Sequence, residues 1–132
     1  MRALNKQAAR VMDQLLQELG EGDHVKIDRG GAGIMAVVVE KLETSSLGVH
    51  YSVAHYYVQE GDMMRDPEMI FIKSHVDGAY YPCYYLQDNA GLEQESIFFD
   101  EDGRVMVKPK MQADHATFAN TWMANIKEQQ KL

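Results

Sequence analysis

The sequence predicts an α+β fold in which an antiparallel, meandering β-sheet of five to six strands is flanked by N-terminal and C-terminal helices. Apolar residues recur at helical spacing near both ends of the chain, and β-branched and aromatic residues are concentrated between them. Tight turns separate these extended segments, which makes consecutive strands antiparallel neighbours. The 132 residues contain no repeat and no linker, so we expect a single domain over residues 1–132.

Both ends of the chain are predicted to be helical. Residues 3–19 carry apolar side chains at helical spacing, and the glycines at positions 20 and 22 end this pattern. A second helix is predicted over residues 112–130, with Phe118, Trp122 and Ile126 on one stripe. The stripe of the first helix comprises Leu4, Ala8, Val11, Met12, Leu15 and Leu19.

Extended segments follow the first helix. Residues 24–29 alternate in polarity, residues 34–42 are rich in β-branched side chains, and residues 48–59 form a long strand. An eight-residue loop over 60–67 is predicted to lead into a further strand at 68–75.

Turn sequences organise the rest of the sheet. Asp77-Gly78 predicts a hairpin with a type I′ turn, and its second strand covers 79–86. Another turn lies at 88–91, and a last hairpin joins 96–99 to 104–108 before Pro109.

Two features of the strands need an explanation. Pro82 cannot donate a ladder hydrogen bond, so its strand should be an edge strand or contain a bulge. Several strands are apolar on both faces, and two helices can cover only about one face of the sheet. The second face would be shielded by a separately packed helix, a partner chain or a ligand, and we favour a homodimer.

Composition excludes several classes of protein. Thirteen basic and twenty acidic residues give a net charge of −7, which makes a nucleic-acid surface unfavourable. No apolar run approaches the roughly 18 residues of a membrane helix, and the first residues are too polar for a signal peptide, so we expect a cytoplasmic protein. The single cysteine, Cys83, excludes an intramolecular disulfide and is expected to be an inert, buried thiol.

The segment 55–69 carries the most unusual combination of side chains. Its histidine, acids and arginine are residue types that hold divalent metals or perform acid–base chemistry, and His55 and Glu68 could approach one another at the base of the loop. The alternative is a solvated hairpin loop whose acids and glycine serve turn geometry. The candidate residues of this segment are His55, Tyr57, Asp62, Arg65, Asp66 and Glu68.

All seven tyrosines lie between positions 51 and 85. Strict alternation places Tyr57 on the face of His55, and it places Tyr81 and Tyr85 together on one face of their strand. Tyrosine suits half-wet interfaces, so an aromatic binding face is one interpretation and ordinary cross-strand pairing is the other.

Residues 88–102 contain six acids and no basic residue. This run could attract a basic partner or imitate a nucleic-acid backbone, although solvated turns have the same composition. The sequence has no P-loop, G-x-S-x-G, H-E-x-x-H or G-x-G-x-x-G motif.

The segment HYYVQEGDMMRDPEM resembles a family of domains of unknown function from bacteria, phages and mobile genetic elements. The strands around Glu40 and YYPCYYLQD are also similar, so the resemblance covers roughly residues 24–90. It implies no reaction, cofactor or partner.

We therefore expect a small, non-enzymatic accessory or protein-interaction module of bacterial or mobile-element origin, with no cofactor and no metal. It would bind a protein partner or a second copy of itself through segment 55–69 and the adjoining Tyr81 and Tyr85. One alternative is a metal-assisted hydrolase using His55, Asp62, Asp66 and Glu68. The other is an acidic nucleic-acid mimic.

Overall fold

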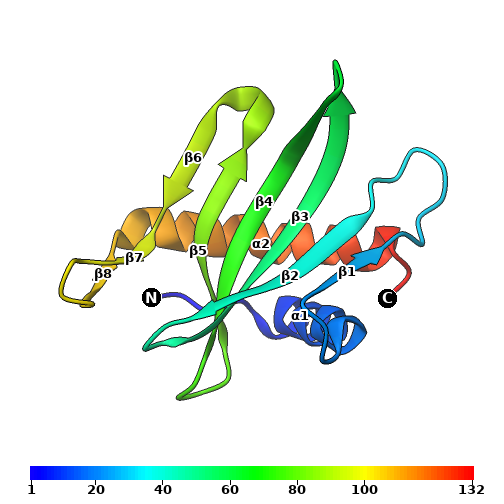
Figure 1. The fold of residues 1–132 in the computed structure, drawn as a ribbon. Helices are drawn as coiled ribbons and strands as arrows, with labels where there is room; N and C mark the ends of the chain where they lie inside the picture. Colours follow the sequence, from blue (N-terminus) through cyan, green and yellow to red (C-terminus); the bar gives the residue numbers. More distant parts are fainter.

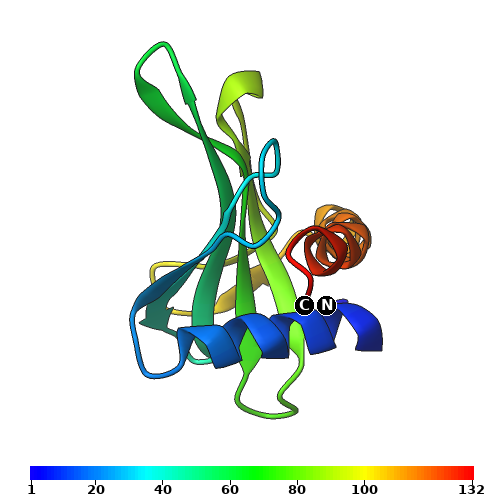
Figure 2. The same ribbon diagram turned by 90° about the vertical axis from the view of Figure 1, so that its right-hand side faces the viewer.

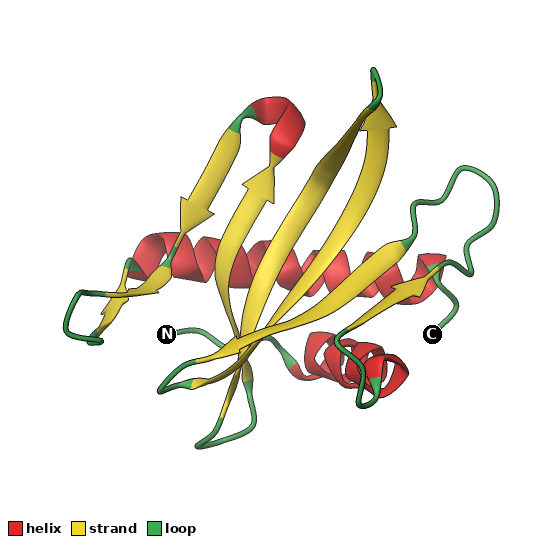
Figure 3. Ribbon diagram, in the orientation of Figure 1, coloured by secondary structure: helices red, strands yellow, loops and turns green.

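The computed structural model describes residues 1–132 and has the predicted α+β architecture (Figure 1). Six strands form one antiparallel sheet in the order β1-β2-β3-β4-β5-β6, so each strand lies beside its neighbours in the chain. A separate two-stranded sheet pairs β7 with β8 (Figure 3). The elements are α1 Lys6–Leu19, β1 His24–Ile27, β2 Val37–Thr44, β3 Gly48–Gln59, β4 Asp62–Ser74, β5 Tyr80–Gln87, the short 3-10 helix η1 Asp88–Ala90, β6 Leu92–Glu95, β7 Ile97–Phe99, β8 Val105–Val107 and α2 Pro109–Gln129.

Helix α1 ends at Leu19 as predicted but begins at Lys6, three residues later than predicted. The Asn5 side chain caps the first turn by accepting a hydrogen bond of 2.8 Å from the Ala8 amide. Gly20 ends the helix with φ 59°, and its amide bonds to the carbonyl of Leu16. Tyr80 of β5 donates a 2.6 Å hydrogen bond to Asp13, which ties the helix to the sheet.

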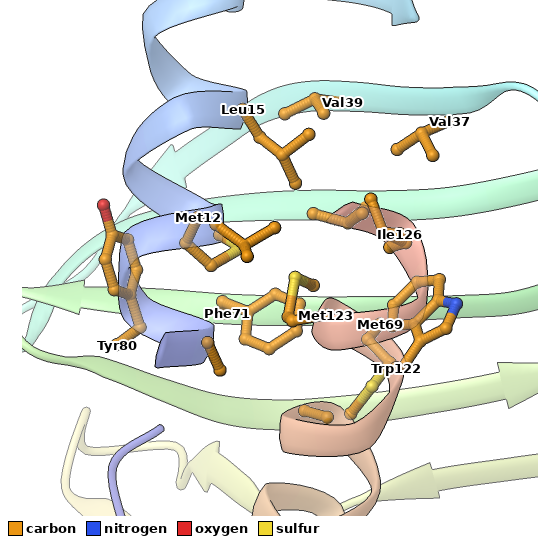
Figure 4. Close-up of a cluster of buried hydrophobic side chains, with 14 of the residues drawn as sticks. Met12, Leu15, Val37, Val39, Met69, Phe71, Tyr80, Trp122, Met123 and Ile126 are labelled. Carbon is orange, nitrogen blue, oxygen red and sulfur yellow. The ribbon is translucent and has the colours of Figure 1, made fainter. Parts of the chain in front are cut away.

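The main core lies between the two helices and one face of the sheet (Figures 2 and 4). Phe71 at its centre is fully buried, between Met12 and Leu15 of α1 and Met123 and Ile126 of α2. Both helices are therefore used to cover the same side of the sheet, as their number and length predict. Neither helix has the length and apolar character that a membrane crossing requires.

Two buried glutamines fasten the ends of α2 to the rest of the chain. Gln112 accepts a hydrogen bond from the Arg2 amide and donates to the carbonyls of Arg2 and Pro82. Gln130 accepts from the Arg29 amide and donates to the Met35 carbonyl at 3.0 Å. The two side-chain amides thereby connect α2 to the N-terminal segment, to β5 and to the loop between β1 and β2.

The predicted loop over 60–67 is wrong. Gln59 pairs directly with Asp62, so the β3–β4 hairpin turns on Glu60 and Gly61 alone. Their φ values of 51° and 85° are the positive angles that a two-residue type I′ turn requires. The hairpin consequently rises beyond the ends of β2 and β5 as a two-stranded arm (Figure 1).

The hairpin at Asp77-Gly78 is confirmed, but its type I′ turn is not. Five residues separate β4 from β5, and only Gly78 has a positive φ. The Asp77 side chain instead accepts a 2.9 Å hydrogen bond from the Ala79 amide, which closes an Asx-type turn.

The C-terminal half differs from the prediction in smaller ways. Strand β6 was not predicted, because its four residues are mostly polar and exposed. The last hairpin is confirmed but stands apart from the main sheet as β7–β8. Helix α2 starts at Pro109, which occupies the first helical turn, and Phe118 remains 40% exposed.

The predicted bulge at Pro82 is confirmed. Phe71 pairs with Pro82 and the adjacent Ile70 pairs with Tyr84, so Cys83 is the extra residue on β5. Strand β5 is an inner strand, but β6 pairs only with its last four residues, beyond the proline.

Candidate functional site

The face of the sheet opposite the two helices is the candidate site, and we call it the open face. The β7–β8 hairpin covers part of it, by packing Ile97 against Ile72 and Cys83. The side chains that project from its uncovered part come from β1 to β6 and are Lys26, Val38, Glu40, Ser52, Tyr56, Arg65, Glu68, Tyr84, Glu93 and Glu95.

The predicted site segment is divided between the two faces. His55 lies on the helix-covered side, where it is buried against Trp122 at 5.5 Å between ring centroids and contacts the Ala36 carbonyl through Nδ1. Glu68 pairs with Ala54 and projects to the open face. The expected approach of His55 to Glu68 is therefore wrong, because neighbouring strand positions point to opposite sides.

A bulge on β4 adds to this division. Between the pairs Ala54–Glu68 and Tyr56–Arg65, β3 has one residue and β4 has two, Asp66 and Pro67. The extra residue returns Arg65 to the same face as Glu68, three positions away. Without the bulge, an odd spacing would put the two side chains on opposite faces.

Arg65 and Glu68 form the centre of an ion-pair network on the open face. The Arg65 guanidinium donates to both oxygens of Asp88 at 3.0 and 3.2 Å, and the Arg65 amide donates to Asp88 at 2.8 Å. Nη1 of Arg65 also contacts Glu68 at 3.3 Å, and the buried Ser52 hydroxyl donates to Glu68 at 2.5 Å. The bidentate Arg65 contact holds the pKa of Asp88 below its usual value and raises the pKa of Arg65.

The metal-assisted hydrolase lacks the geometry it requires. Asp62 is exposed at the end of the arm, Asp66 lies at the bulge, and His55 faces the opposite side from Glu68. No three histidine, cysteine or acidic side chains converge at a distance that could hold a metal ion.

The tyrosines do not form one surface, which corrects the prediction that Tyr81 and Tyr85 share a face. The extra residue Cys83 reverses the alternation, so Tyr85 projects to the helix-covered side and Tyr81 to the open side. Tyr85 stacks on His115 at 6.1 Å and contacts Phe118 edge-on. Tyr81 is tied to the hairpin loop by a 2.8 Å hydrogen bond to Asp77.

Tyr57 and Tyr56 lie at the base of the arm. Tyr57 is half-buried on the helix side and donates to Gln59 at 3.3 Å. Tyr56 projects to the open face, where burial and the carboxylates of Glu68 and Glu40 raise its pKa, while Arg65 opposes the shift.

Four carboxylates around the open face have no lysine or arginine partner: Glu40, Glu43, Glu93 and Glu95. Glu43 lies 3.9 Å from His50, whose pKa is lowered by burial, so that the imidazole is neutral at pH 7. Glu93 accepts a 2.6 Å hydrogen bond from Tyr84; burial and this contact raise the tyrosine's pKa. Lys26 is the one unpaired cation that projects from the same face.

The acids of residues 88–102 are distributed over three places, which does not match a nucleic-acid mimic. Asp88 is paired with Arg65, and Arg104 forms ion pairs with Asp100 and Asp102 in the β7–β8 turn. Glu93 and Glu95 alone lie side by side on one face of β6. A regular row of charges, which a mimic of a phosphate backbone needs, is not formed.

The structure also reveals a buried serine–histidine pair that the sequence did not indicate. Ser96 Oγ lies 2.8 Å from Nδ1 of His115, and Nε2 of this ring lies 3.1 Å from Oε1 of Gln94. Ser96 is completely buried, and burial lowers the pKa of His115 while the nearby Asp114 opposes the shift. A sealed serine cannot meet a substrate, so this network joins α2 to the β6–β7 junction. Nothing in the spacing of residues 19 positions apart reveals such a contact.

Two hollows flank the network of Arg65 on the open face. One, of about 370 Å³, lies where the arm leaves the sheet and is lined mainly by apolar side chains, including Val38, Tyr56 and Met63. The other, of about 230 Å³, lies between the sheet and β7 and contains Cys83 in its lining. Burial, with Glu95 and Glu43 nearby, raises the pKa of the Cys83 thiol to about 12, and its sulfur contacts the Ile70 carbonyl. The thiol is buried, as predicted.

This architecture defines a class of protein: a six-stranded antiparallel meander with both helices on one side and a largely polar, acidic face on the other. The chain belongs to a family described as a domain of unknown function (DUF6908), which matches residues 6–132. No curated protein and no solved structure matches the chain.

Proposed function

We propose that this protein is a non-enzymatic protein-interaction module and that a basic segment of a partner protein binds to its open face. The carrying observation is the set of four carboxylates without lysine or arginine partners around a sheet face that neither helix covers. Uncompensated charge of one sign steers and selects partners of the opposite sign.

The end of the open face nearest the arm supplies an apolar contact. Val58 and Met63 pair across the arm and are 66% and 65% exposed. They adjoin Tyr56 and Val38 at the larger hollow. Exposed apolar and aromatic side chains beside charged ones are typical of protein interfaces. This combination favours a protein partner over nucleic acid, whose phosphates the carboxylates would repel.

Charge also favours a different chain over a second copy of this one. In a two-fold dimer through the open face, the same acidic patch would meet itself. Each copy would bring four carboxylates without lysine or arginine partners to the interface and only one unpaired cation, Lys26. A basic partner avoids this repulsion, so we place self-association second.

Capture of a partner with matched variants tests the proposal. Tagged wild type, Glu40→Lys/Glu93→Lys and the control Glu21→Lys/Glu128→Lys are incubated with extract of the native host at two salt concentrations. The control alters the same charge at exposed positions outside the open face. We expect a basic protein that binds wild type and control, is lost from the open-face variant and weakens with salt.

The captured protein is then purified and its Kd measured by calorimetry for all three chains. Equal binding by both double variants, or the absence of any saturable partner, would overturn the proposal. A dimer of this chain that depends on the open face would replace the basic partner with a second copy; light scattering at several concentrations detects it.

A further inference from the structure

We propose that the smaller hollow of the open face, between the sheet and β7, binds the side chain of one lysine or arginine of the partner. This inference rests on the proposed function and deepens it, because it assigns an anchor position to the basic segment.

The hollow combines an apolar floor with aromatic walls. Ile70 and Cys83 of the sheet and Ile97 of β7 form the apolar part of a space of about 230 Å³. Tyr84 and the neighbouring rings of His50 and Phe99, whose centroids lie 6.2 Å apart, flank it. A side chain with an aliphatic stem fits such a lining, because its methylene groups leave water on entry.

Two carboxylates supply the complementary charge. Glu43 and Glu95 both line the hollow and come from β2 and β6, on opposite sides of the strands that form its floor. Both raise the pKa of the same thiol, Cys83, so their charges act on one point from two directions. A cation held there would be attracted by both carboxylates.

No basic side chain of the protein already occupies this position. Neither Glu43 nor Glu95 forms an ion pair with a lysine or arginine. His50 lies 3.9 Å from Glu43, its Nε2 shares a 2.8 Å hydrogen bond with the Ser45 hydroxyl, and burial lowers its pKa, which favours the neutral imidazole. Lys108 lies over the Phe98 ring at 5.6 Å and lines a separate hollow near the start of α2.

The chemistry of the lining selects among ligands. An acidic or phosphorylated side chain would be repelled by the two glutamates. A purely apolar side chain would contact the apolar floor, but it would displace water from the glutamates without replacing the hydrogen bonds of that water. Lysine and arginine match both the apolar floor and the charged walls. Their aliphatic stem contacts the floor, and their cationic group contacts the carboxylates and the ring faces.

The position of the hollow also suits an extended segment. His50 beside this hollow and Tyr56 beside the larger one are six residues apart on β3, a span of about 20 Å. A partner strand of about six residues therefore reaches from a basic anchor in the small hollow to an apolar contact at the arm.

Nuclear magnetic resonance titration tests the anchor directly. The probes are the capped tripeptides Gly-Lys-Gly, Gly-Arg-Gly, Gly-norleucine-Gly and Gly-Glu-Gly, added separately to ¹⁵N-labelled protein. We expect saturable shifts for the lysine or arginine peptide that centre on the amides of Glu43, Cys83, Tyr84 and Glu95, with none for the glutamate peptide. The norleucine peptide retains the stem and should bind at least about ten-fold more weakly.

A matched pair of variants then tests the role of charge. Glu43→Gln/Glu95→Gln should raise the Kd of the basic peptide about ten-fold, because each exposed carboxylate contributes a modest attraction. Glu21→Gln/Glu128→Gln changes the net charge equally at exposed positions elsewhere and should leave the Kd unchanged. Dispersed spectra establish that both variants are folded.

Three results would overturn the anchor. These are equal shifts by the norleucine and lysine peptides, equal Kd values for the two double variants, and shifts that lie outside the hollow. A free polyamine, spermidine, that binds ten-fold more tightly than the lysine peptide would overturn the assignment to a protein side chain. If the anchor fails while Glu40→Lys/Glu93→Lys still abolishes partner capture, the proposed function stands; if that capture is also unaffected, both fail.

Discussion

The two faces of the sheet are made by the same strands and differ in how they exclude water. On the helix-covered face, Val37, Val53, Met69 and Phe71 are completely buried against α1 and α2. On the open face, neither α1 nor α2 contributes, and the buried Ser52 is hydrogen-bonded to Glu68, which contacts Arg65. One face is closed by apolar packing against two helices, whereas the other combines a small apolar cluster under β7 with hydrogen bonds and ion pairs.

This difference separates stability from recognition. Apolar packing supplies most of the free energy of folding, so residues on the helix-covered face are fixed by the core. Exposed ion pairs contribute little to stability. Exposed side chains on the open face can therefore be changed at small cost to folding, which is the property of a surface that selects a partner.

The largest expected effect is on the helix-covered face. Phe71→Ala should lower the free energy of unfolding by about 3–5 kcal/mol, because it leaves a cavity at the centre of the main core. Urea denaturation followed by Trp122 fluorescence measures it. A loss below about 1 kcal/mol would show that this face is not the packed side of the sheet.

A smaller effect is expected beneath the open face. Ser52→Ala removes the hydroxyl that donates to Glu68 at 2.5 Å and should cost about 1.5–3 kcal/mol, the range for hydrogen bonds to charged groups. The same urea experiment measures it. Glu68→Gln should lower the free energy of unfolding less in the Ser52→Ala background than in wild type, because the hydrogen bond between the two residues is already absent. Additive losses would contradict this coupling.

Two of the three buried histidines, His115 and His50, have lowered pKa values and make stability depend on pH. Burial lowers the pKa values of His115 and His50, so the unfolded chain takes up protons first as pH falls. The contribution of these histidines should be constant above about pH 7 and fall below about pH 6.5, by up to about 1.4 kcal/mol per pH unit for each histidine.

Denaturation at pH 7.5 and pH 5.5 measures this slope. His115→Gln should reduce it, and His50→Gln in addition should remove it between these two values. The exposed His24→Gln serves as control and should leave the slope intact. A wild type that is equally stable at both pH values would contradict the assignment.

The smallest expected change in stability is at the unpaired carboxylates. Glu40→Gln/Glu93→Gln should alter the free energy of unfolding by no more than about 0.5 kcal/mol per site, as for other surface substitutions. The same variant should weaken binding of the basic partner, measured by calorimetry. Loss of stability without loss of binding would show that these carboxylates serve folding rather than recognition, which contradicts the proposed difference between the two faces.

Sequence patterns predicted the elements of the fold well and their faces less well. The stripe of α1, the full extent of β3 and the bulge at Pro82 follow from local spacing and residue chemistry. The two-residue turn was missed because Glu60 adopts a positive φ that a glutamate seldom takes. That error turned part of β4 into a loop.

The candidate site was predicted only in part. A bulge adds a single residue, but it changes the face of the sheet to which every later side chain of that strand projects. Each extra residue, at Asp66–Pro67 and at Cys83, inverts the alternation beyond it. Arg65 and Glu68 therefore meet, while Tyr81 and Tyr85 separate. The contacts of Arg65 with Asp88, 23 positions apart, depend on the register of three strands. The binding role of the predicted site residues, the homodimer and the bacterial or mobile-element origin stay predictions.

The reactivity of the buried Cys83 can be used to measure how often the β7–β8 hairpin opens. Thiol reagents attack the thiolate, and a pKa near 12 keeps that form scarce while β7 screens the sulfur from solvent. Labelling of Cys83 should therefore be slow in the folded protein, and faster when the β7–β8 hairpin moves away from the sheet. The rate at which a reagent modifies this single thiol will therefore report how often β7 separates from the sheet. No engineered cysteine is needed, because Cys83 is the only cysteine of the chain.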